Sequence, residues 1–399
     1  MFGSIRHEPQ DEVEVAEIIR RAADRFSPLR IEGGGTKSSA GRPIRADTVL
    51  SSANLRGITM HEPSELIIQA RSGTPVDVVQ ALLREKGQDL PFEPPSLSSL
   101  YGARGRPTIG ALAAMNLSGP RRISVGAARD CLLGVRFVNG RGEIVKSGGR
   151  VMKNVTGLDL VKLVAGSWGT LGFITEVTFK VLPSARASGT LCIEGLSDAD
   201  AIEILTRAMG SSYDVSGAAH IPEQDMDVPA QTLVRIEGSS ASVEVRANRL
   251  RALLGEGRTV LSFDEERSAA IWSGIRELTP LRVRSDEVVW RLSVPPDCAA
   301  EVTAFVGSKL EGARWYFDWS GGLIWLALPS RTETEYNSVR MVIQKVGGHA
   351  TLVRASEDVR RSVPVFQELP PALMAITAQL KHAFDPAGIL NPSLMYERI

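Results

Sequence analysis

Glycine-rich segments interrupt the first half of the sequence at three places, and they restrict its fold more than any other feature. They lie at residues 32–38, 108–130 and 151–183. Glycine lets a backbone turn sharply and approach another group closely, because it has no side chain to collide. Three such segments are more than ordinary connections require. Such a composition supports close approaches of the backbone to a ligand rather than a packed core.

The first segment, Glu32 to Ser38, has the chemistry of a phosphate-binding turn. Its three consecutive glycines can direct several backbone N–H groups at one point, and its two hydroxyls add further donors. The pattern is not GxGxxG and no helix is expected directly after it, which disfavours a Rossmann site. The spacing also excludes a Walker A loop. A metal-free diphosphate site and an ordinary glycine-rich turn remain as the two interpretations.

The other two segments suggest further close approaches of the backbone. Small residues at 110, 111, 113 and 114 would let the start of a helix lie against a flat ring system, although a closely packed helix would need the same residues. The four glycines of the third segment, at 157, 166, 169 and 172, break helix from strand twice within sixteen residues. Both segments are therefore candidates for contact with the same ligand.

Length and composition restrict the class of protein. A chain of 399 residues is too long for one compact core, so two domains are expected. The formal net charge is zero, which argues against a nucleic-acid or anionic-lipid partner. No stretch approaches the roughly 20 apolar residues that cross a bilayer, and the amino terminus lacks a signal-peptide pattern. We expect a cytoplasmic protein without a membrane span.

The cysteines and histidines carry no local signature of a metal or cluster site. The three cysteines, Cys131, Cys192 and Cys298, are widely separated and form no CxxC pair. The five histidines contain no HxH or HExxH pair. The sequence therefore predicts neither an iron–sulfur cluster nor a metal centre in this chain.

Apolar periodicity in the first half predicts short strands alternating with helices. Thr74 and Pro75 have the pattern of an N-cap and first helical residue, and Gly87 that of a helix end. Asn139-Gly140 is typical of a hairpin turn. The expected elements are a helix over 11–25, a strand over 28–32, a second apolar strand around 67–68, a helix over 74–87, hairpin strands over 131–138 and 143–146, and a strand over 173–182.

From residue 185 to about 360, strand-like runs alternate with amphipathic helices. This pattern suits an α+β domain with one or two sheets covered by helices on one face. The expected strands include 233–237, 288–294 and 322–328, and the expected helices 199–209, 243–254, 332–346 and, near the carboxyl terminus, 371–383. We therefore divide the chain into residues 1–183, a second domain at 184–360, and a carboxyl-terminal segment at 361–399.

The glycine-rich segments together resemble the PCMH-type FAD-binding domain of the vanillyl-alcohol oxidase and D-lactate dehydrogenase superfamily. The third segment carries the resemblance: KNVTGLDLVKLVAGSWGTLGFITE is similar to the hallmark of D-lactate dehydrogenases and glycolate oxidase subunits. The final FDPAGILNP also resembles a carboxyl-terminal signature of this family. The resemblance implies a two-lobed FAD domain over residues 1–183, an α+β cap domain with an antiparallel sheet, and a terminal segment that returns to the flavin domain.

The resemblance also implies which residues contact FAD. Residues 33–38 would wrap the pyrophosphate, Ile174 would present its backbone to the adenine side, and Asn391 would be the polar residue nearest the isoalloxazine. The complete set of implied FAD contacts is Gly33, Gly34, Gly35, Thr36, Lys37, Ser38, Thr108, Gly110, Ser118, Gly119, Gly126, Arg129, Ile174 and Asn391.

The attachment of FAD is expected to be non-covalent. Many members of the superfamily attach FAD through a histidine or cysteine, and residues 33–41 contain neither. Cys131, close to the second glycine segment, is expected to be a buried strand residue instead. Acid precipitation that left the yellow colour in the pellet would contradict this expectation.

The cap domain lacks the histidines of its catalytic relatives. In the family's larger subunits, segments reading HAGDGNLH and GEHG are assigned to a divalent metal site. Asp318, Trp325, Val353 and Arg354 stand at the corresponding positions here, so no metal is expected. Arg291 and His349 are the catalytic candidates: Arg291 would pair with a carboxylate or cap a sheet face, and His349 would be a lone base or an exposed strand end. The tryptophans at 315, 319 and 325 are expected in the core or at an interface.

The resemblance as a whole points to the FAD-binding subunit of a glycolate oxidase. The implied partners are a larger metal-site flavoprotein subunit, an iron–sulfur subunit and a small 2-hydroxy acid, with any membrane association coming only through the complex. Two other functions remain open: a structural FAD scaffold for the catalytic subunit, and a stand-alone FAD-dependent dehydrogenase of another hydroxy acid.

Overall fold

The protein folds into two compact units. One short segment, residues 119–125, interrupts the sequence of the first unit and belongs to the second. The structure, a computed structural model, describes residues 5–149, 158–223, 228–330, 333–397 and 399. The first unit contains residues 1–118, 126–184 and 368–399, and the second contains residues 119–125 and 185–367. Residues 151–157 of the third glycine segment lie outside the described residues. In the described part of the chain, no helix is long and apolar enough to cross a membrane.

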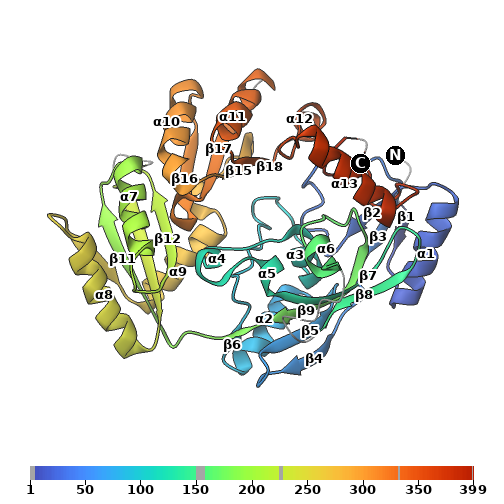
Figure 1. The fold of residues 1–399 in the computed structure, drawn as a ribbon, viewed down its shortest axis with the longest axis horizontal. Coiled ribbons are helices and arrows are strands. Elements are labelled where there is room, and N and C mark those ends of the chain that lie inside the picture. Colours follow the sequence, from blue (N-terminus) through green and yellow to red (C-terminus); the bar gives the residue numbers. More distant parts are fainter. Residues whose placement is uncertain (1–4, 150–157, 224–227, 331–332, 398) are drawn as a thin grey trace. The chain divides into compact units, whose positions relative to one another are not determined.

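A small parallel sheet and the first helix begin the first unit (Figure 1). The sheet has the order β1-β3-β2, and β3 pairs in parallel with both neighbours. Asp11 caps helix α1 by accepting hydrogen bonds from the backbone N–H groups of Val13 and Glu14. One face of α1 is buried against the sheet. These elements are β1 (Ile5–His7), α1 (Glu12–Asp24), β2 (Leu29–Glu32) and β3 (Thr48–Ser51).

An antiparallel sheet of order β4-β5-β9-β7-β8 forms the other part of the first unit in the described residues. Helices α2, α3 and α6 pack on it around one apolar cluster. A two-stranded ribbon, β6 with β10, lies beside it. The elements are β4 (Ile58–Glu62), β5 (Ile67–Arg71), α2 (Val76–Glu85), β6 (Gln88–Asp89), α3 (Ile109–Met115), α5 (Ala128–Cys131), β7 (Leu132–Val138), β8 (Ile144–Gly148), α6 (Leu160–Val164), β9 (Phe173–Lys180), β10 (Leu182–Pro183) and α13 (Pro371–Phe384).

The second unit is built on one long antiparallel sheet. Its eight strands, counted in the described residues, have the order β14-β11-β13-β12-β16-β17-β15-β18. The strands are β11 (Ala187–Glu194), β12 (Val215–Ile221), β13 (Gln231–Gly238), β14 (Val260–Phe263), β15 (Glu287–Ser293), β16 (Arg314–Asp318), β17 (Leu323–Pro329) and β18 (His349–Arg354). The helices are α4 (Arg122–Val125), α7 (Asp198–Met209), α8 (Ser240–Leu254), α9 (Glu265–Arg276), α10 (Ala299–Lys309), α11 (Glu333–Lys345) and α12 (Glu357–Ser362), with short 3₁₀ turns at Thr279–Leu281, Pro296–Cys298 and Trp319–Gly321.

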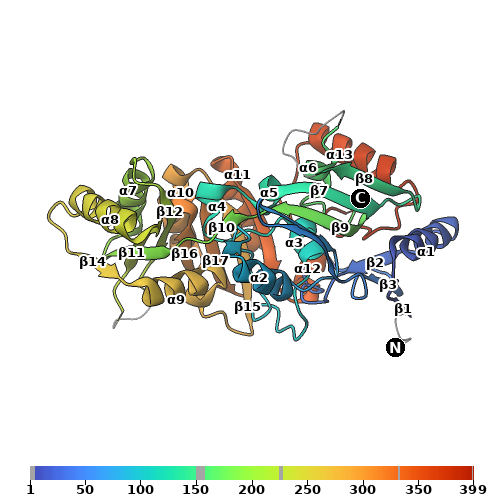
Figure 2. The same ribbon diagram turned by 90° about the horizontal axis from the view of Figure 1, so that it is seen from below.

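Helices cover both faces of this sheet, whereas the sequence predicted helices on one face only. Helices α7, α8, α10 and α11 pack on one face, and Figure 2 shows α9 on the other. Trp272 of α9 lies against Gly217 and donates from its indole N–H to Thr190 Oγ1 at 2.9 Å. The missing side chain at Gly217 makes room for the indole. The expectation was wrong because alternation along a strand does not say which helix covers its second face.

Most of the predicted elements are confirmed. The hairpin forms between β7 and β8 around Asn139, whose side-chain Oδ1 accepts from Arg141 and Glu143 N–H. The N-cap of α2 was predicted one residue too early: Pro75 is the cap. Thr74 instead donates its hydroxyl to the carbonyl of Arg71 at 2.7 Å and thereby closes the preceding turn.

Candidate functional site

The turn after β2 presents a row of backbone donors without acceptors. Within the described residues, the N–H groups of Gly33, Gly34, Gly35 and Thr36 donate no hydrogen bond to the protein. Thr36 is buried, with 4% of its surface exposed. Buried or half-buried N–H groups are normally paired, so consecutive unpaired ones indicate an anion that binds there. This arrangement suits the negatively charged oxygens of a diphosphate.

Residues 105–108 approach the same turn closely. A Cβ added to Gly34 would collide with the carbonyl oxygen of Arg106, and one added to Gly33 would collide with Thr108 Oγ1. The hydroxyl of Thr108 is itself buried without a partner in the described residues, as is that of Ser72 nearby. Two unsatisfied hydroxyls beside four unsatisfied N–H groups form one donor-rich cradle. Only glycine at positions 33 and 34 leaves this cradle open.

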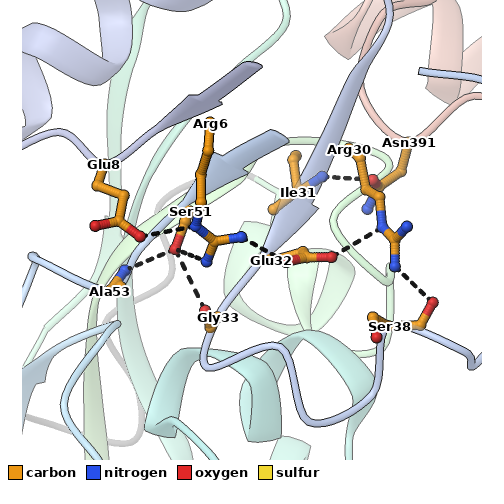
Figure 3. A network of polar contacts seen from close by, with 10 residues as sticks. All are labelled: Arg6, Glu8, Arg30, Ile31, Glu32, Gly33, Ser38, Ser51, Ala53 and Asn391. Carbon is orange, nitrogen blue, oxygen red and sulfur yellow. Dashed lines mark hydrogen bonds and ion pairs between the residues drawn. The ribbon is translucent and has the colours of Figure 1, made fainter. Parts of the chain in front are cut away.

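Salt bridges hold the turn from its other side (Figure 3). Glu32 accepts from Arg6 at 3.1 Å and from Arg30 at 2.9 Å. Arg30 also donates to the carbonyl of Ser38 at 2.7 Å, so it fastens the far end of the turn. Arg6 donates to Ser51 Oγ at 3.0 Å. Because these bonds use side chains and carbonyl oxygens, they leave the backbone N–H groups of the turn available.

Lys37 and Ser38 lie at the end of this turn but are oriented differently. The ammonium group of Lys37 donates to the carbonyl of Ser96 at 3.0 Å and to Thr36 Oγ1 at 3.3 Å. The side chain of Ser38 is exposed. Lys37 therefore secures the turn to a neighbouring loop while its positive charge stays beside the cradle.

A second group of predicted site residues meets at the start of α5. Ser118 Oγ accepts from the N–H of Ala128 at 2.9 Å, and Asn116 Oδ1 accepts from the N–H of Arg129 at 2.9 Å. Gly126 has a φ of +86°, which glycine tolerates best, and a Cβ there would crowd Asp130. The guanidinium of Arg129 is exposed and makes no hydrogen bond or ion pair in the described chain. Ser118 thus shapes the loop, and Arg129 is available to a ligand.

Gly110 and Ile174 are both enclosed by protein backbone. The N–H of Gly110 donates to the carbonyl of Ser72 at 2.9 Å, and a Cβ at Gly110 would contact Ser72. Ile174 is buried in β9, where it pairs with Phe137 of β7. If either residue contacts a cofactor, it must do so through neighbouring residues or through backbone atoms that are not already hydrogen-bonded.

Asn391 ties the carboxyl-terminal segment to the strand before the glycine turn. Its Oδ1 accepts from the N–H of Ile31 at 2.8 Å, and its Nδ2 donates to the carbonyl of Trp168 at 2.8 Å (Figure 3 shows the first of these). The side chain is buried, and its φ of +44° is left-handed. A contact of this amide with a flavin ring would have to share these hydrogen bonds.

Cys131 lies in the core of the first unit, as the sequence predicted, but it is the last residue of helix α5 and not a strand residue. Only 4% of its surface is exposed, and burial raises the pKa of its thiol to about 11. A thiol with this pKa stays protonated near neutral pH, and the thiolate is the reactive form. The environment of Cys131 therefore opposes covalent attachment of a cofactor through its sulfur.

The remaining predicted residues belong to the second unit. The carbonyl of Gly119 accepts from the indole N–H of Trp319 at 3.1 Å, so Gly119 is held by this unit. Arg291 is partly buried on β15, and His349 is exposed at the start of β18. Asp318 is buried and caps the backbone N–H of Trp319 at 2.7 Å. Among the described residues, no group of three His, Cys, Asp or Glu side chains could hold a metal ion.

The first unit contains a donor set that fits a flavin dinucleotide. The four unpaired N–H groups and the orphan hydroxyl of Thr108 would be satisfied by a diphosphate, which needs no metal to bind there. Ser72 and the Gly105–Arg106 backbone were not predicted from the sequence, because their proximity to the turn depends on tertiary contacts. Glycine at 105 was the available signal, since a Cβ there would meet the carbonyl of Gly34.

Comparison with known proteins agrees with this fit. A family model described as an FAD binding domain matches residues 5–148. The chain is 34% identical over 383 residues to glycolate oxidase subunit GlcE of Escherichia coli (strain K12), covering 96% of this chain and 97% of that protein. It is 25% identical to glycolate oxidase subunit GlcD of Bacillus subtilis (strain 168), covering 98% and 88% of the two chains.

Solved structures show the same fold at low sequence identity. A 4-ethylphenol oxidase from Gulosibacter chungangensis matches with a TM-score of 0.72 at 14% identity, over 98% of this chain and 90% of that one. An alkyldihydroxyacetonephosphate synthase matches with a TM-score of 0.70 at 16% identity, over 97% and 76%. Taken with the whole-length similarity to GlcE, these matches mean that the chain belongs to the family of FAD-binding glycolate oxidase subunits, within the FAD-dependent oxidoreductases of the PCMH type.

Proposed function

We propose that this chain is the FAD-binding subunit of a glycolate oxidase complex that converts glycolate to glyoxylate. The observation that carries the proposal is the similarity to GlcE, which extends over nearly the full length of both chains. The relatives named as glycolate oxidase subunits support an assembly of several chains. The proposed partners are a larger flavoprotein subunit with a metal site and an iron–sulfur subunit that passes electrons to a quinone. We place the complex in the cytoplasm, with any membrane association through the partners.

In this proposal the first unit holds FAD without a covalent bond. The N–H groups of residues 33–36 and the hydroxyl of Thr108 would bind the diphosphate, and Lys37 would contribute positive charge beside it. Bound FAD supplies a two-electron acceptor for the hydride that leaves the 2-carbon of a hydroxy acid. The protein's own part is to fix the diphosphate and to keep the turn rigid through Glu32 and its two arginines.

We assign cofactor binding to residues 1–183 with the segment 361–399, and a cap function to residues 184–360. The implied contacts Ser118, Gly126 and Arg129 lie together at the start of α5, which supports one further part of the FAD site. Gly119 belongs to the second unit in the described structure, and its contact with FAD stays a proposal that rests on the family resemblance.

A second function is that FAD serves as a structural element and the chain as a scaffold for the catalytic subunit. One observation favours it: Asp318, where the family resemblance places a histidine of the metal site, is buried and committed to the backbone of Trp319. It is therefore not available as a general base. This candidate shares the FAD site with the first and differs only in whether the flavin is reduced by substrate.

Anaerobic mixing with glycolate separates the two functions. The chain is purified alone and with its partners, and the visible absorption band of its own flavin is followed after glycolate is added. We expect bleaching of this flavin within the complex if the chain takes part in oxidation. An unchanged flavin in a complex that still oxidises glycolate would exclude the redox function and leave the scaffold. Acid precipitation of the same preparation should release the yellow colour into the supernatant.

A further inference from the structure

Two arginines of the second unit share one tryptophan ring. The guanidinium carbon of Arg122 lies 4.5 Å from the ring centroid of Trp319, and that of Arg291 lies 5.1 Å from it. Arg122 comes from α4, and Arg291 comes from β15, which lies between β17 and the edge strand β18 of the long sheet. Two positive groups at one aromatic ring repel each other, although each is attracted by the ring.

Trp319 is held in place by two hydrogen bonds of its own. Its indole N–H donates to the carbonyl of Gly119 at 3.1 Å, and its backbone N–H donates to Asp318 Oδ1 at 2.7 Å. Trp319 and Ser320 both have left-handed φ values, +53° and +55°. Consecutive left-handed residues other than glycine carry a conformational cost and persist where surrounding contacts hold them, often at functional sites. The indole ring of Trp319 is therefore fixed in position.

Arg291 has no anionic partner in the described chain. It makes no hydrogen bond or ion pair with a described residue, and its partners across the strands, Trp325 and Thr351, are uncharged. Burial lowers the pKa of Arg291 to about 10, and repulsion from Arg122 adds to this effect. Arginines that are taken out of water normally pair with a carboxylate or phosphate.

Two acids on the same face of the sheet, Glu287 and Asp318, are committed to other partners. Glu287 of β15 binds Arg314 through both oxygens, at 2.7 and 2.6 Å, and accepts from the N–H of Arg284. Asp318 caps Trp319, as described above. A carboxylate thus neutralises Arg314 of β16, whereas Arg291 of β15 has no carboxylate partner among the described residues. The contrast indicates that the charge at Arg291 is kept for a group from outside the chain.

We infer that Arg122, Arg291 and Trp319 form a binding site for the carboxylate of a small 2-hydroxy acid. A planar carboxylate can accept two parallel hydrogen bonds from one guanidinium and lie beside the flat ring. The two bonds fix the orientation of the carboxylate, which the point-like charge of a lysine would not do. The choice of a 2-hydroxy acid rests on the function proposed above, whereas the anion site rests on the geometry of the second unit alone. Arg291 is the principal contact and Arg122 the second charge.

Binding to the oxidised, FAD-loaded chain tests this inference directly. Isothermal calorimetry compares glycolate with glycolamide, which has the same shape without the charge, at an ionic strength fixed with chloride. We expect glycolate to bind at least tenfold more tightly than glycolamide. Replacing Arg291 with methionine should weaken glycolate binding at least tenfold, and Arg291→Lys should weaken it less, since it keeps the charge and loses the fork.

Arg267 supplies the matched control. It stacks on Phe263 at 3.8 Å in the same unit and is exposed, so Arg267→Met removes an arginine–aromatic contact without touching the proposed site. Its glycolate affinity should equal that of the unaltered chain. Circular dichroism and FAD content establish that each variant is folded. If Arg291→Met does not fold, Arg291→Lys and Arg122→Gln carry the test, and both must weaken binding.

Three results would overturn the inference: no glycolate binding to the unaltered chain, equal binding of glycolamide or inorganic phosphate, or unchanged affinity in the folded Arg291 variants. The fate of the proposed function is read separately, from bleaching of the flavin by glycolate in the complex. Arginine-dependent binding without bleaching would sustain the carboxylate site and reject redox function. Bleaching with unaltered affinity and KM in Arg291→Met would sustain the function and reject the site.

Discussion

Lys381 is a buried cation that secures the carboxyl-terminal segment. Its ammonium group donates to Asp385 Oδ2 at 2.7 Å and to the carbonyls of Thr170 and Leu390 at 2.8 and 2.7 Å. Asp385 is fully buried and also accepts from the N–H of Leu390 at 2.8 Å. Three partners satisfy all three ammonium donors, so burial is tolerated although it lowers the pKa of Lys381. Lys381 and Asn391 therefore both hold the terminal segment FDPAGILNP, residues 384–392, in its conformation.

Replacing Lys381 with methionine should destabilise the first unit by about 3–5 kcal/mol, because it leaves the carboxylate of Asp385 buried without its cation. Urea unfolding followed by circular dichroism measures the loss. Lys345→Met is the control, since Lys345 pairs with Glu301 at the exposed surface and should cost at most about 1 kcal/mol. Equal midpoints for the two variants would show that the buried pair does not stabilise the fold.

Asp198 gives the second unit a pH-dependent contribution to stability. Burial would raise the pKa of this carboxyl, but hydrogen bonds from His220, Trp315 and Thr303 outweigh burial and hold the pKa below its ordinary value of 3.8. A carboxyl whose folded pKa is lowered stabilises the protein above its ordinary pKa, and this stabilisation is lost as the pH falls through the folded value. The sensitive range therefore begins near pH 4 and extends to lower pH.

Asp198→Asn should remove this part of the acid sensitivity. The variant should be less stable than the unaltered chain at neutral pH, and the difference should shrink as the pH falls below about 4. Thermal unfolding at a series of pH values, followed by tryptophan fluorescence, reports the effect. Asp200→Asn, an exposed position on the same helix, is the control. A constant gap between Asp198→Asn and the unaltered chain across this range would contradict the proposed linkage.

At the level of elements, periodicity predicted the longer helices and strands but not the short parallel sheet. Strand β1 has three residues and β3 has four, too few to show a pattern, and their pairing joins residues more than forty positions apart. The resemblance to a flavin domain supplied the glycine turn, whereas Ser72 and the backbone at 105–106 emerged only from tertiary packing. Arg122 was not predicted either, because its contact with Trp319 depends on tertiary packing and no neighbouring residue in the sequence indicates it.

The glycine turn is the element whose geometry is most restrictive. Gly34→Ala places a Cβ where the carbonyl of Arg106 lies, so the turn must move away from residues 105–108 and scatter its N–H donors. We expect the affinity for FAD to fall on the order of tenfold or more, about 1.4 kcal/mol or more. The ratio of flavin to protein after gel filtration measures it. Gly274→Ala, where a Cβ meets only ordinary contacts, should retain FAD, and equal retention in Gly34→Ala would reject the turn as the phosphate site.

At the level of the whole molecule, the proposed FAD site lies in one of the two units. The turn, Thr108 and the carboxyl-terminal segment belong to the first unit, while the long sheet and the paired arginines belong to the second. The chain nevertheless passes between the units four times, at residues 118–119, 125–126, 184–185 and 367–368. The sequence predicted a boundary near 183 from Pro183. It contained no signal that residues 119–125 join the other unit, because only contacts such as that of Trp319 with Gly119 place them there.

A ligand that binds one folded unit stabilises that unit by mass action, by about 2.7 kcal/mol when it is present at a hundred times its dissociation constant. FAD should therefore raise the unfolding temperature of the first unit and leave that of the second nearly unchanged. Five of the six tryptophans lie in the second unit, so tryptophan fluorescence reports mainly on it, and release of flavin reports on the first. Removing FAD should lower the unfolding temperature of the first unit and leave that of the second nearly unchanged. If both probes instead shift together by the same amount when FAD is added, the units unfold as one, and FAD stabilises the chain as a single cooperative structure.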